Sequence, residues 1–312
     1  MDYAISLEDH GFPVGAKAHV FEPKWHRRDV EIYLIPGFLS DTPKDSKESI
    51  WSAKVPNEWD YAADRLATSH QARVLVIRWP SKSVMELLAK IELATAGIPV
   101  LVGAVGRVLP LIVFPRLLMA PATALTFFPW LRSLWNLKSE WDQAVAQADE
   151  TSKALGSFVV SRSSEHVCFV GHSLGGRICI KVLEAAPNHQ AQSFSSIALA
   201  PAVLDNEVSW EDIRPLPHPR IEAYWSYGDL VLAVLFRTGQ FTLGSPIGFS
   251  GPLPSRQNLV KSVDCTKCGK WLGRGHGDYL GDLEELLERS PIFVGTVGKG
   301  SVPPVAEPLK TR

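Results

Sequence analysis

Residues 166–183 read HVCFVGHSLGGRICIKVL, and this stretch decides the fold. Its first five residues, His166 to Val170, form a short apolar run that predicts a buried strand. A glycine-rich turn, Gly171 to Gly176, follows, and the residues from Arg177 onward predict a helix. A strand that passes through a sharp turn into a helix is the context in which a turn serine is held at a strained backbone position with its hydroxyl exposed.

This turn gives Ser173 the placement that nucleophilic catalysis requires. A serine hydroxyl is a poor nucleophile until a base removes its proton. Gly171 and Gly175, two residues before and two residues after Ser173, leave room for the strand and the helix to cross closely. The N-terminus of the helix presents N–H groups and a positive dipole end to a developing oxyanion. We therefore predict that Ser173 is a nucleophile and that Gly171, His172, Gly175 and Gly176 form its elbow.

Further runs of the same kind predict a parallel sheet around this elbow. Because predicted helices separate several of the predicted strands, the chain is expected to form a mostly parallel sheet flanked by helices, which is the α/β class. With the elbow, the prediction becomes an α/β-hydrolase fold. The other predicted strands are Val30 to Ile35, Arg73 to Ile77, Ser195 to Leu199, Ile221 to Tyr227 and Leu259 to Val263, and the helices are Trp59 to Ser69, Glu140 to Leu155 and Arg177 to Ala186.

A base and an orienting acid should follow the nucleophile in the order serine, acid, histidine. Of nine histidines, only His276 lies beyond the last predicted strand, in a glycine-rich loop. Asp229 directly follows the predicted strand Ile221 to Tyr227 and is the favoured acid, because a carboxylate there can hold the imidazole tautomer. Asp205 is the second candidate, and Asp278 is a third that lies very close to His276 in sequence.

An oxyanion hole needs two N–H donors. Leu174 supplies one as the residue after the nucleophile. The second is expected from the loop Pro36-Gly37-Phe38-Leu39, which follows the strand Val30 to Ile35. Phe38 N–H is the first choice, and Gly37 N–H is the alternative.

One segment departs from the sheet pattern. Residues 93–139 contain no acidic residue, while arginines, prolines and tryptophans interrupt an otherwise apolar sequence. No window is uninterrupted enough for a helix that spans a bilayer, which needs about 20 mostly apolar residues. The segment 81–138 is therefore predicted to be an apolar helical insertion. Two roles stay open for it: a cap that packs over the active site, or an element that contacts a membrane surface through residues 93–139.

Composition excludes several classes of protein. A formal net charge of −1, without a block of Lys and Arg, argues against nucleic-acid binding. Four cysteines are too few for a secreted disulfide framework. The N-terminal sequence MDYAISLED carries acids where a signal peptide needs a basic flank. A cytoplasmic protein, with possible membrane association through 93–139, is therefore expected. Cys265 and Cys268 form a single Cys-x-x-Cys pair, whereas structural zinc usually needs four ligands, so no metal and no cofactor are predicted.

Residues 1–295 are predicted to form one α/β-hydrolase domain that includes the insertion 81–138, and residues 296–312 a flexible tail. The sequence resembles the family of α/β-hydrolase proteins typified by the transmembrane and coiled-coil domain-containing hydrolases. The resemblance rests on Gly171 to Arg177, on the segment YWSYGDLVL at 224–232, which runs into Phe236-Arg237-Thr238, and on GHGDY at 275–279. It implies a lipase-like or phospholipase-like serine hydrolase with the triad Ser173, Asp229 and His276.

The predicted activity is hydrolysis of an ester bond in a lipid or another apolar acyl substrate, by a lipase, a phospholipase or a carboxylesterase. Thioesterases and acyltransferases use the same triad, so the sequence does not separate them from an esterase. A protein of another class stays open as well, because a fold does not guarantee activity: a catalytically inactive hydrolase-fold protein that tethers membranes.

Overall fold

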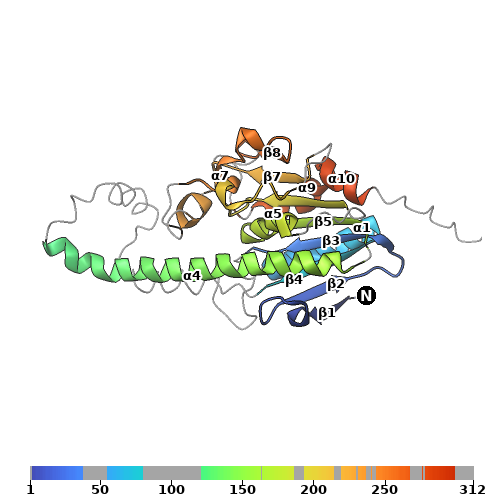
Figure 1. Cartoon of the computed structure of the whole chain (residues 1–312), viewed down its shortest axis with the longest axis horizontal. Coiled ribbons are helices and arrows are strands. Elements are labelled where there is room, and N and C mark those ends of the chain that lie inside the picture. The colour runs from blue at the N-terminus through green and yellow to red at the C-terminus, as the bar shows by residue number, and fades with distance from the viewer. Residues whose placement is uncertain are drawn as a thin grey trace, which may run out of the picture.

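A computed structural model gives the three-dimensional structure of the chain (Figure 1). Within its helices, the side chains of 55–58, 121–137, 234, 235, 278 and 280 are not described. The structure describes residues 2–37, 55–79, 121–162, 164–185, 193–213, 219–229, 231–236, 240, 244–267, 276 and 278–298.

One eight-stranded sheet contains the strands of the described chain, in the order β1-β2-β4-β3-β5-β6-β7-β8. The pair β1 and β2 is antiparallel, β2 runs antiparallel to β4, and the remaining pairs are parallel. Helical segments connect the parallel strands, as crossover connections require. The strands are β1 (Asp2–Ser6), β2 (Lys17–Phe21), β3 (Arg27–Ile35), β4 (Ala72–Arg78), β5 (His166–His172), β6 (Ser193–Leu199), β7 (Ile221–Trp225) and β8 (Val260–Asp264).

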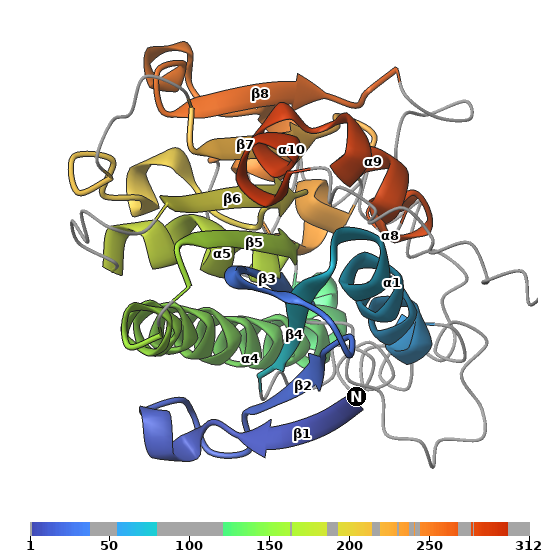
Figure 2. The same cartoon turned by 90° about the vertical axis from the view of Figure 1, so that its right-hand side faces the viewer.

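Helices cover both faces of this sheet (Figure 2). Helices α4 and α5 pack together on one face, where α5 contacts β5 and β6. Helix α10 contacts the same two strands from the other face, and α1 lies on that face as well. The helices are α1 (Val55–His70), α4 (Pro121–Val160), α5 (Leu174–Ala185), α7 (Ile247–Ser250), α8 (Asp278–Gly281), α9 (Leu283–Arg289) and α10 (Pro291–Val297), with 3-10 turns at Glu8–His10, Asp205–Glu207 and Pro254–Arg256 and a π-helical turn at Leu232–Phe236.

The two faces of the sheet bury large side chains. Tyr33 of β3 and Phe169 of β5 are buried beside each other, with ring centroids 5.5 Å apart. Trp59 of α1 and Trp79, which follows β4, are buried as well. A mostly parallel sheet that is covered on both faces, with a sharp turn between β5 and α5, is the α/β-hydrolase fold that the sequence predicted.

Each of the six predicted strands is present, with ends that differ by a few residues. Strands β1 and β2 were not predicted. β1 lies at the edge of the sheet and is almost entirely exposed, so its sequence carries no apolar run. At the C-terminus, α10 extends to Val297, two residues beyond the predicted domain end, and residues 299–312 lie outside the described residues.

The predicted helix Glu140 to Leu155 is part of a much longer one. Helix α4 spans 40 residues, from Pro121 to Val160, and so includes the last part of the predicted insertion 81–138. Its N-terminal half extends past the end of the sheet (Figure 1). Residues 80–120 lie outside the described residues. Within the described chain, no helix combines the length and the apolar character that crossing a membrane requires.

Candidate active site

Ser173 stands at the turn between β5 and α5, where the backbone takes an unusual conformation. Its φ is +57°, in the left-handed region that residues other than glycine disfavour. The surrounding strands hold this conformation: Ser173 N–H donates to the Leu199 carbonyl of β6 at 2.9 Å, and Ala202 N–H donates to the Ser173 carbonyl at 3.0 Å. Such a position persists only where the surroundings fix it, so the sheet itself presents this serine.

The glycines of the elbow are needed for close approach. A Cβ on Gly171 would overlap the Gly175 carbonyl and the Cys179 sulfur, and a Cβ on Gly175 would overlap the carbonyl oxygen of Ile35 in β3. A Cβ on Gly176 would lie 3.0 Å from the Cα of Pro201. The spacing that predicted the elbow is thus explained by direct packing of backbone on backbone.

The loop after β3 reaches the nucleophile. A Cβ on Gly37 would lie 2.9 Å from the Ser173 Cβ and 2.7 Å from the His172 carbonyl oxygen, so this loop lies directly against the elbow. The buried Trp79 indole N–H donates to the Pro36 carbonyl at 2.9 Å and fixes the loop. Phe38, the predicted second oxyanion donor, lies outside the described residues. Leu174, the predicted first donor, is buried and begins α5.

The predicted acid and base are hydrogen-bonded. His276 Nδ1 lies 2.7 Å from Asp229 Oδ2, and both side chains are buried. An ionised carboxylate can only accept a hydrogen bond, so Nδ1–H is the donor in this contact and Nε2 is the ring nitrogen that remains for a second contact. The other carboxylate oxygen, Oδ1, accepts a hydrogen bond from Leu232 N–H at 2.9 Å. Asp229 is therefore held rigidly where it can orient His276.

The alternative acids do not take this place. Asp205 pairs with Arg256 at 3.4 Å and accepts a hydrogen bond from Leu253 N–H. The side chain of Asp278 lies outside the described residues. Between the two described acids, only Asp229 contacts His276.

A second histidine fixes the loop that carries His276. His172 Nε2 lies 2.6 Å from the His276 carbonyl oxygen, which makes Nε2 the donor, and the two rings lie with centroids 4.5 Å apart. Burial, together with the neighbouring His276, lowers the pKa of His172 to about 3, so this ring stays neutral near pH 7. The sequence predicted His172 only as an elbow residue. Its contact across 104 positions of sequence had no local signal.

The His276 ring therefore lies beside the residue that precedes Ser173. Within the described part of the chain, no hydrogen bond joins the Ser173 hydroxyl to His276. Catalytic hydrogen bonds are often long before substrate binds and tighten in the complex. All three predicted residues are thus at one edge of the sheet, and all three are largely buried: Ser173 is 8% exposed, His276 7% and Asp229 0%.

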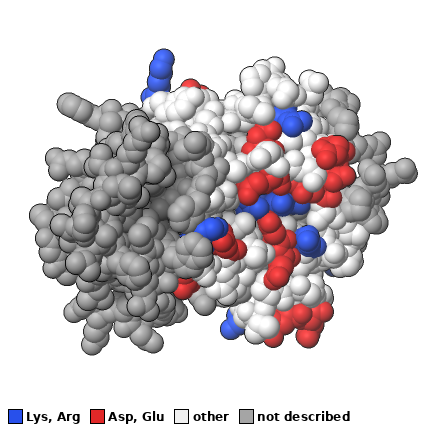
Figure 3. Space-filling model, turned by 60° about the vertical axis from the view of Figure 1, so that its left-hand side comes forward, with Lys and Arg blue, Asp and Glu red and all other residues white. Residues whose placement is uncertain are grey.

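A buried ion-pair network supports the elbow helix and was not predicted. Arg177, only 3% exposed, pairs with Asp149 of α4 and with Glu207 at 2.8 Å each. Lys181 adds a hydrogen bond to the Glu207 carbonyl at 3.1 Å. This network ties α4, α5 and the segment after β6 together. Figure 3 shows acidic and basic side chains next to one another across the described surface.

The described cysteines are thiols buried in the fold. Cys168 of β5 and Cys179 of α5 flank the elbow, and Cys265 follows β8. Burial raises the pKa of Cys168 to about 12 and that of Cys179 well above its usual value. Cys268 lies outside the described residues, and among the described residues no group of three or more His, Cys, Asp and Glu side chains could hold a metal ion.

Comparison with known proteins finds a family and a relative. The family model described as "Protein of unknown function (DUF726)" matches residues 49–292. The "Transmembrane and coiled-coil domain-containing protein STS1" of Oryza sativa subsp. japonica is 25% identical over 169 residues, which are 51% of this chain and 24% of that protein. The chain thus matches about a quarter of that relative's length.

Solved structures with some likeness to this one include bacterial esterases. The esterase Est2 of Thermogutta terrifontis is 13% identical with a TM-score of 0.41 and covers 98% of this chain and 95% of its own. XC6422 of Xanthomonas campestris, an α/β serine hydrolase, is also 13% identical with a TM-score of 0.41, over 92% and 94%. Esterase B of Lactobacillus rhamnosis is 10% identical with a TM-score of 0.44, over 95% and 86%.

Proposed function

Because the chain belongs to the family described as "Protein of unknown function (DUF726)", we propose its activity from its own residues: it is a serine hydrolase that cleaves carboxylic esters of lipids or other apolar acyl substrates. The observation that carries the proposal is the 2.7 Å contact between Asp229 and His276 beside the Ser173 elbow. A nucleophile, a base and an acid that orients the base are the three parts that nucleophilic acyl transfer requires.

The proposed reaction proceeds in two halves. His276 Nε2 takes the proton of the Ser173 hydroxyl while the oxygen attacks the ester carbonyl carbon, and the carbonyl oxygen becomes an oxyanion. Leu174 N–H and Phe38 N–H stabilise that charge. The proton on His276 then passes to the leaving alcohol as the carbon–oxygen bond breaks and an acyl-enzyme remains. Water, deprotonated by His276, attacks the acyl carbon and releases the carboxylic acid, and the proton returns to Ser173.

An apolar substrate is proposed from composition. Residues 93–139 lack acidic residues, and an acyl chain needs apolar surroundings or access to a membrane. We propose that this segment contacts a membrane surface, with its arginines beside anionic head groups. Flotation of the full chain with phosphatidylcholine vesicles, with and without phosphatidylserine, tests this contact. A fraction bound that is equally low on both vesicles would count against it.

Labelling and turnover test the proposed activity together. The wild type should react with a fluorophosphonate probe and release fatty acid from at least one member of a panel of phospholipids, acylglycerols and p-nitrophenyl esters. Ser173→Ala should abolish labelling and lower turnover by about 10⁴-fold or more. Ser157→Ala, an exposed serine of α4, is the matched control and should match the wild type.

The other candidate activities give different results in the same assays. A thioesterase would be labelled but would prefer acyl thioesters, and an acyltransferase would show release that depends on an added alcohol acceptor. No labelling and no turnover in a folded protein that still binds vesicles would favour a catalytically inactive tether instead.

A further inference from the structure

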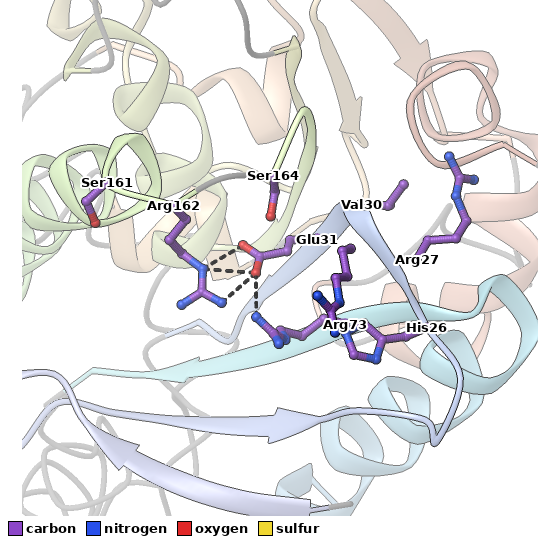
Figure 4. A pocket seen from close by; sticks show the side chains of 9 residues that line it. His26, Arg27, Val30, Glu31, Arg73, Ser161, Arg162 and Ser164 are labelled. Carbon is purple, nitrogen blue, oxygen red and sulfur yellow. Dashed lines mark hydrogen bonds and ion pairs between the residues drawn. The ribbon is translucent and has the colours of Figure 1, made fainter.

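A polar pocket of about 420 Å³ lies at the edge of the sheet opposite the proposed active site (Figure 4). The proposed catalytic residues follow the carboxyl ends of β5 and β7, whereas this pocket forms at the amino ends of β3, β4 and β5. Its volume lies within the usual range for small-molecule sites, roughly 300–1,000 Å³. The lining includes His26, Arg27 and Arg28 around the start of β3, Arg73 of β4, and Arg162 and Ser164 between α4 and β5.

Cations outnumber carboxylates in and around this pocket. Four arginines line it, and the carboxylates that pair with them are Glu31, Glu22 and Asp29. Glu31 is held by two of the arginines, Arg73 at 3.2 Å and Arg162 at 2.6 Å. The fourth arginine, Arg28, is exposed and has no ion pair or hydrogen bond with any described residue.

Donors are available beside this positive charge. A guanidinium has five N–H groups, and Arg73 uses one at each of its three nitrogens toward Glu22 and Glu31, so two remain. Ser164 is 3% exposed and lines the pocket, and its hydroxyl makes no hydrogen bond to a described residue. In Figure 4 the Ser164 side chain points toward Glu31, on the side of the pocket where Arg162 lies. An oxyanion seated here would therefore meet N–H and O–H donors from three separate segments.

We propose that this pocket binds the phosphate group of a small phosphorylated molecule. Arginine forks match the oxygens of a phosphate, and charge-assisted hydrogen bonds are the strongest of their kind. The size of the pocket fits a small molecule. The same phosphate chemistry is carried by soluble phosphate esters and by the head group of phosphatidic acid, and the experiment separates these two sources.

Titration calorimetry on the full chain tests the proposal, with inorganic pyrophosphate and glycerol 3-phosphate as probes at constant ionic strength. Saturable binding by the wild type is expected. Arg28→Gln should weaken it about tenfold through loss of a charge-assisted hydrogen bond, and Ser164→Ala should weaken it by a few-fold. Arg289→Gln, an arginine of α9 with 76% exposure outside the pocket, is the matched control and should bind like the wild type. Thermal unfolding of each variant verifies that it is folded.

The vesicle arm uses phosphatidylcholine with and without phosphatidic acid. Binding to glycerol 3-phosphate, with or without binding to pyrophosphate, assigns the site to soluble phosphate esters, and binding to pyrophosphate alone assigns it to a soluble diphosphate. Binding to phosphatidic acid vesicles alone, lost in Arg28→Gln, assigns it to the lipid head group. The proposal is overturned if neither probe nor vesicle binds, or if a folded Arg28→Gln variant binds as tightly as the wild type. Loss of esterase activity in any variant is a separate readout, because the pocket and the elbow lie at opposite edges of the sheet.

Discussion

The two edges of the sheet each bury a carboxylate, and they surround it differently. At the carboxyl edge, Asp229 contacts one histidine ring and one backbone N–H. At the amino edge, Glu31 contacts two guanidinium groups and accepts a hydrogen bond from the Tyr33 hydroxyl at 2.6 Å. A histidine can gain and lose a proton near neutral pH, whereas arginine stays charged. The first arrangement suits proton transfer, and the second suits a fixed positive site.

The largest expected effect is on turnover at the carboxyl edge. Asp229→Asn should lower kcat by about 10⁴-fold, because an amide in place of the carboxylate favours the wrong tautomer of His276. Steady-state hydrolysis of the best ester substrate measures this. Asp205→Asn removes the other described candidate acid, which pairs with Arg256 instead, and should stay within about twofold of the wild type, as expected for a surface change outside the site. Equal losses in both variants would mean that the acid is misassigned.

The next effect is on stability at the amino edge. Glu31→Gln leaves two guanidinium groups without their buried carboxylate and should lower the free energy of unfolding by about 2–3 kcal/mol, less than for a deeply buried pair because both arginines are partly exposed. Urea unfolding measures the change. Glu285→Gln, which removes an exposed i,i+4 partner of Arg289, is the control and should change it by less than about 0.5 kcal/mol.

The same variant sharpens the comparison between the edges. Since Glu31→Gln removes a negative charge from the pocket, it should tighten pyrophosphate binding while leaving turnover per folded molecule unchanged. A fall in turnover per folded molecule with unchanged pyrophosphate affinity would contradict the roles assigned to the two edges.

The last effect is a pH dependence of stability from His172, which develops gradually as the pH falls. Burial lowers the pKa of this ring from its ordinary 6.5 to about 3, so between these values the unfolded chain binds a proton that the folded chain does not. Stability is therefore lost as the pH falls through this window, at up to about 1.4 kcal/mol per pH unit. His172→Gln does not titrate and keeps an N–H donor for the His276 carbonyl. Its unfolding free energy should fall less steeply than that of the wild type from pH 6.5 to 4.5, and parallel profiles would contradict the prediction.

Much of the fold could be predicted because its signals are local. The strand, turn and helix around Ser173 are adjacent in sequence, and the buried parallel strands carry apolar runs. β1 was missed because it is an exposed edge strand and carries no such run. β2 was missed because polar residues alternate with its first buried apolar ones, so Lys17–Phe21 contains no continuous apolar run. The full length of α4 was missed because its first half belongs to the apolar segment 93–139. That segment was assigned to an insertion and not to the helix that continues from it.

The candidate site was predictable to the extent that chain order constrains it. Serine, acid and histidine occur in a fixed order in this fold, so Asp229 and His276 could be proposed without a structure. The contact of His172 with the His276 carbonyl, the hydrogen bond of Trp79 to Pro36 and the pairing of Arg177 with Asp149 all join distant segments. Only the folded sheet brings these pairs together, so no sequence pattern indicates them.

The buried thiols beside the elbow have a practical consequence for chemical probes. Electrophiles react with thiolates, and the raised pKa values of Cys168 and Cys179 keep both as protonated thiols at neutral pH. Iodoacetamide and similar reagents should therefore leave both cysteines unmodified in the native chain, so a fluorophosphonate adduct mapped to the peptide 166–183 would not be attributed to a thiol.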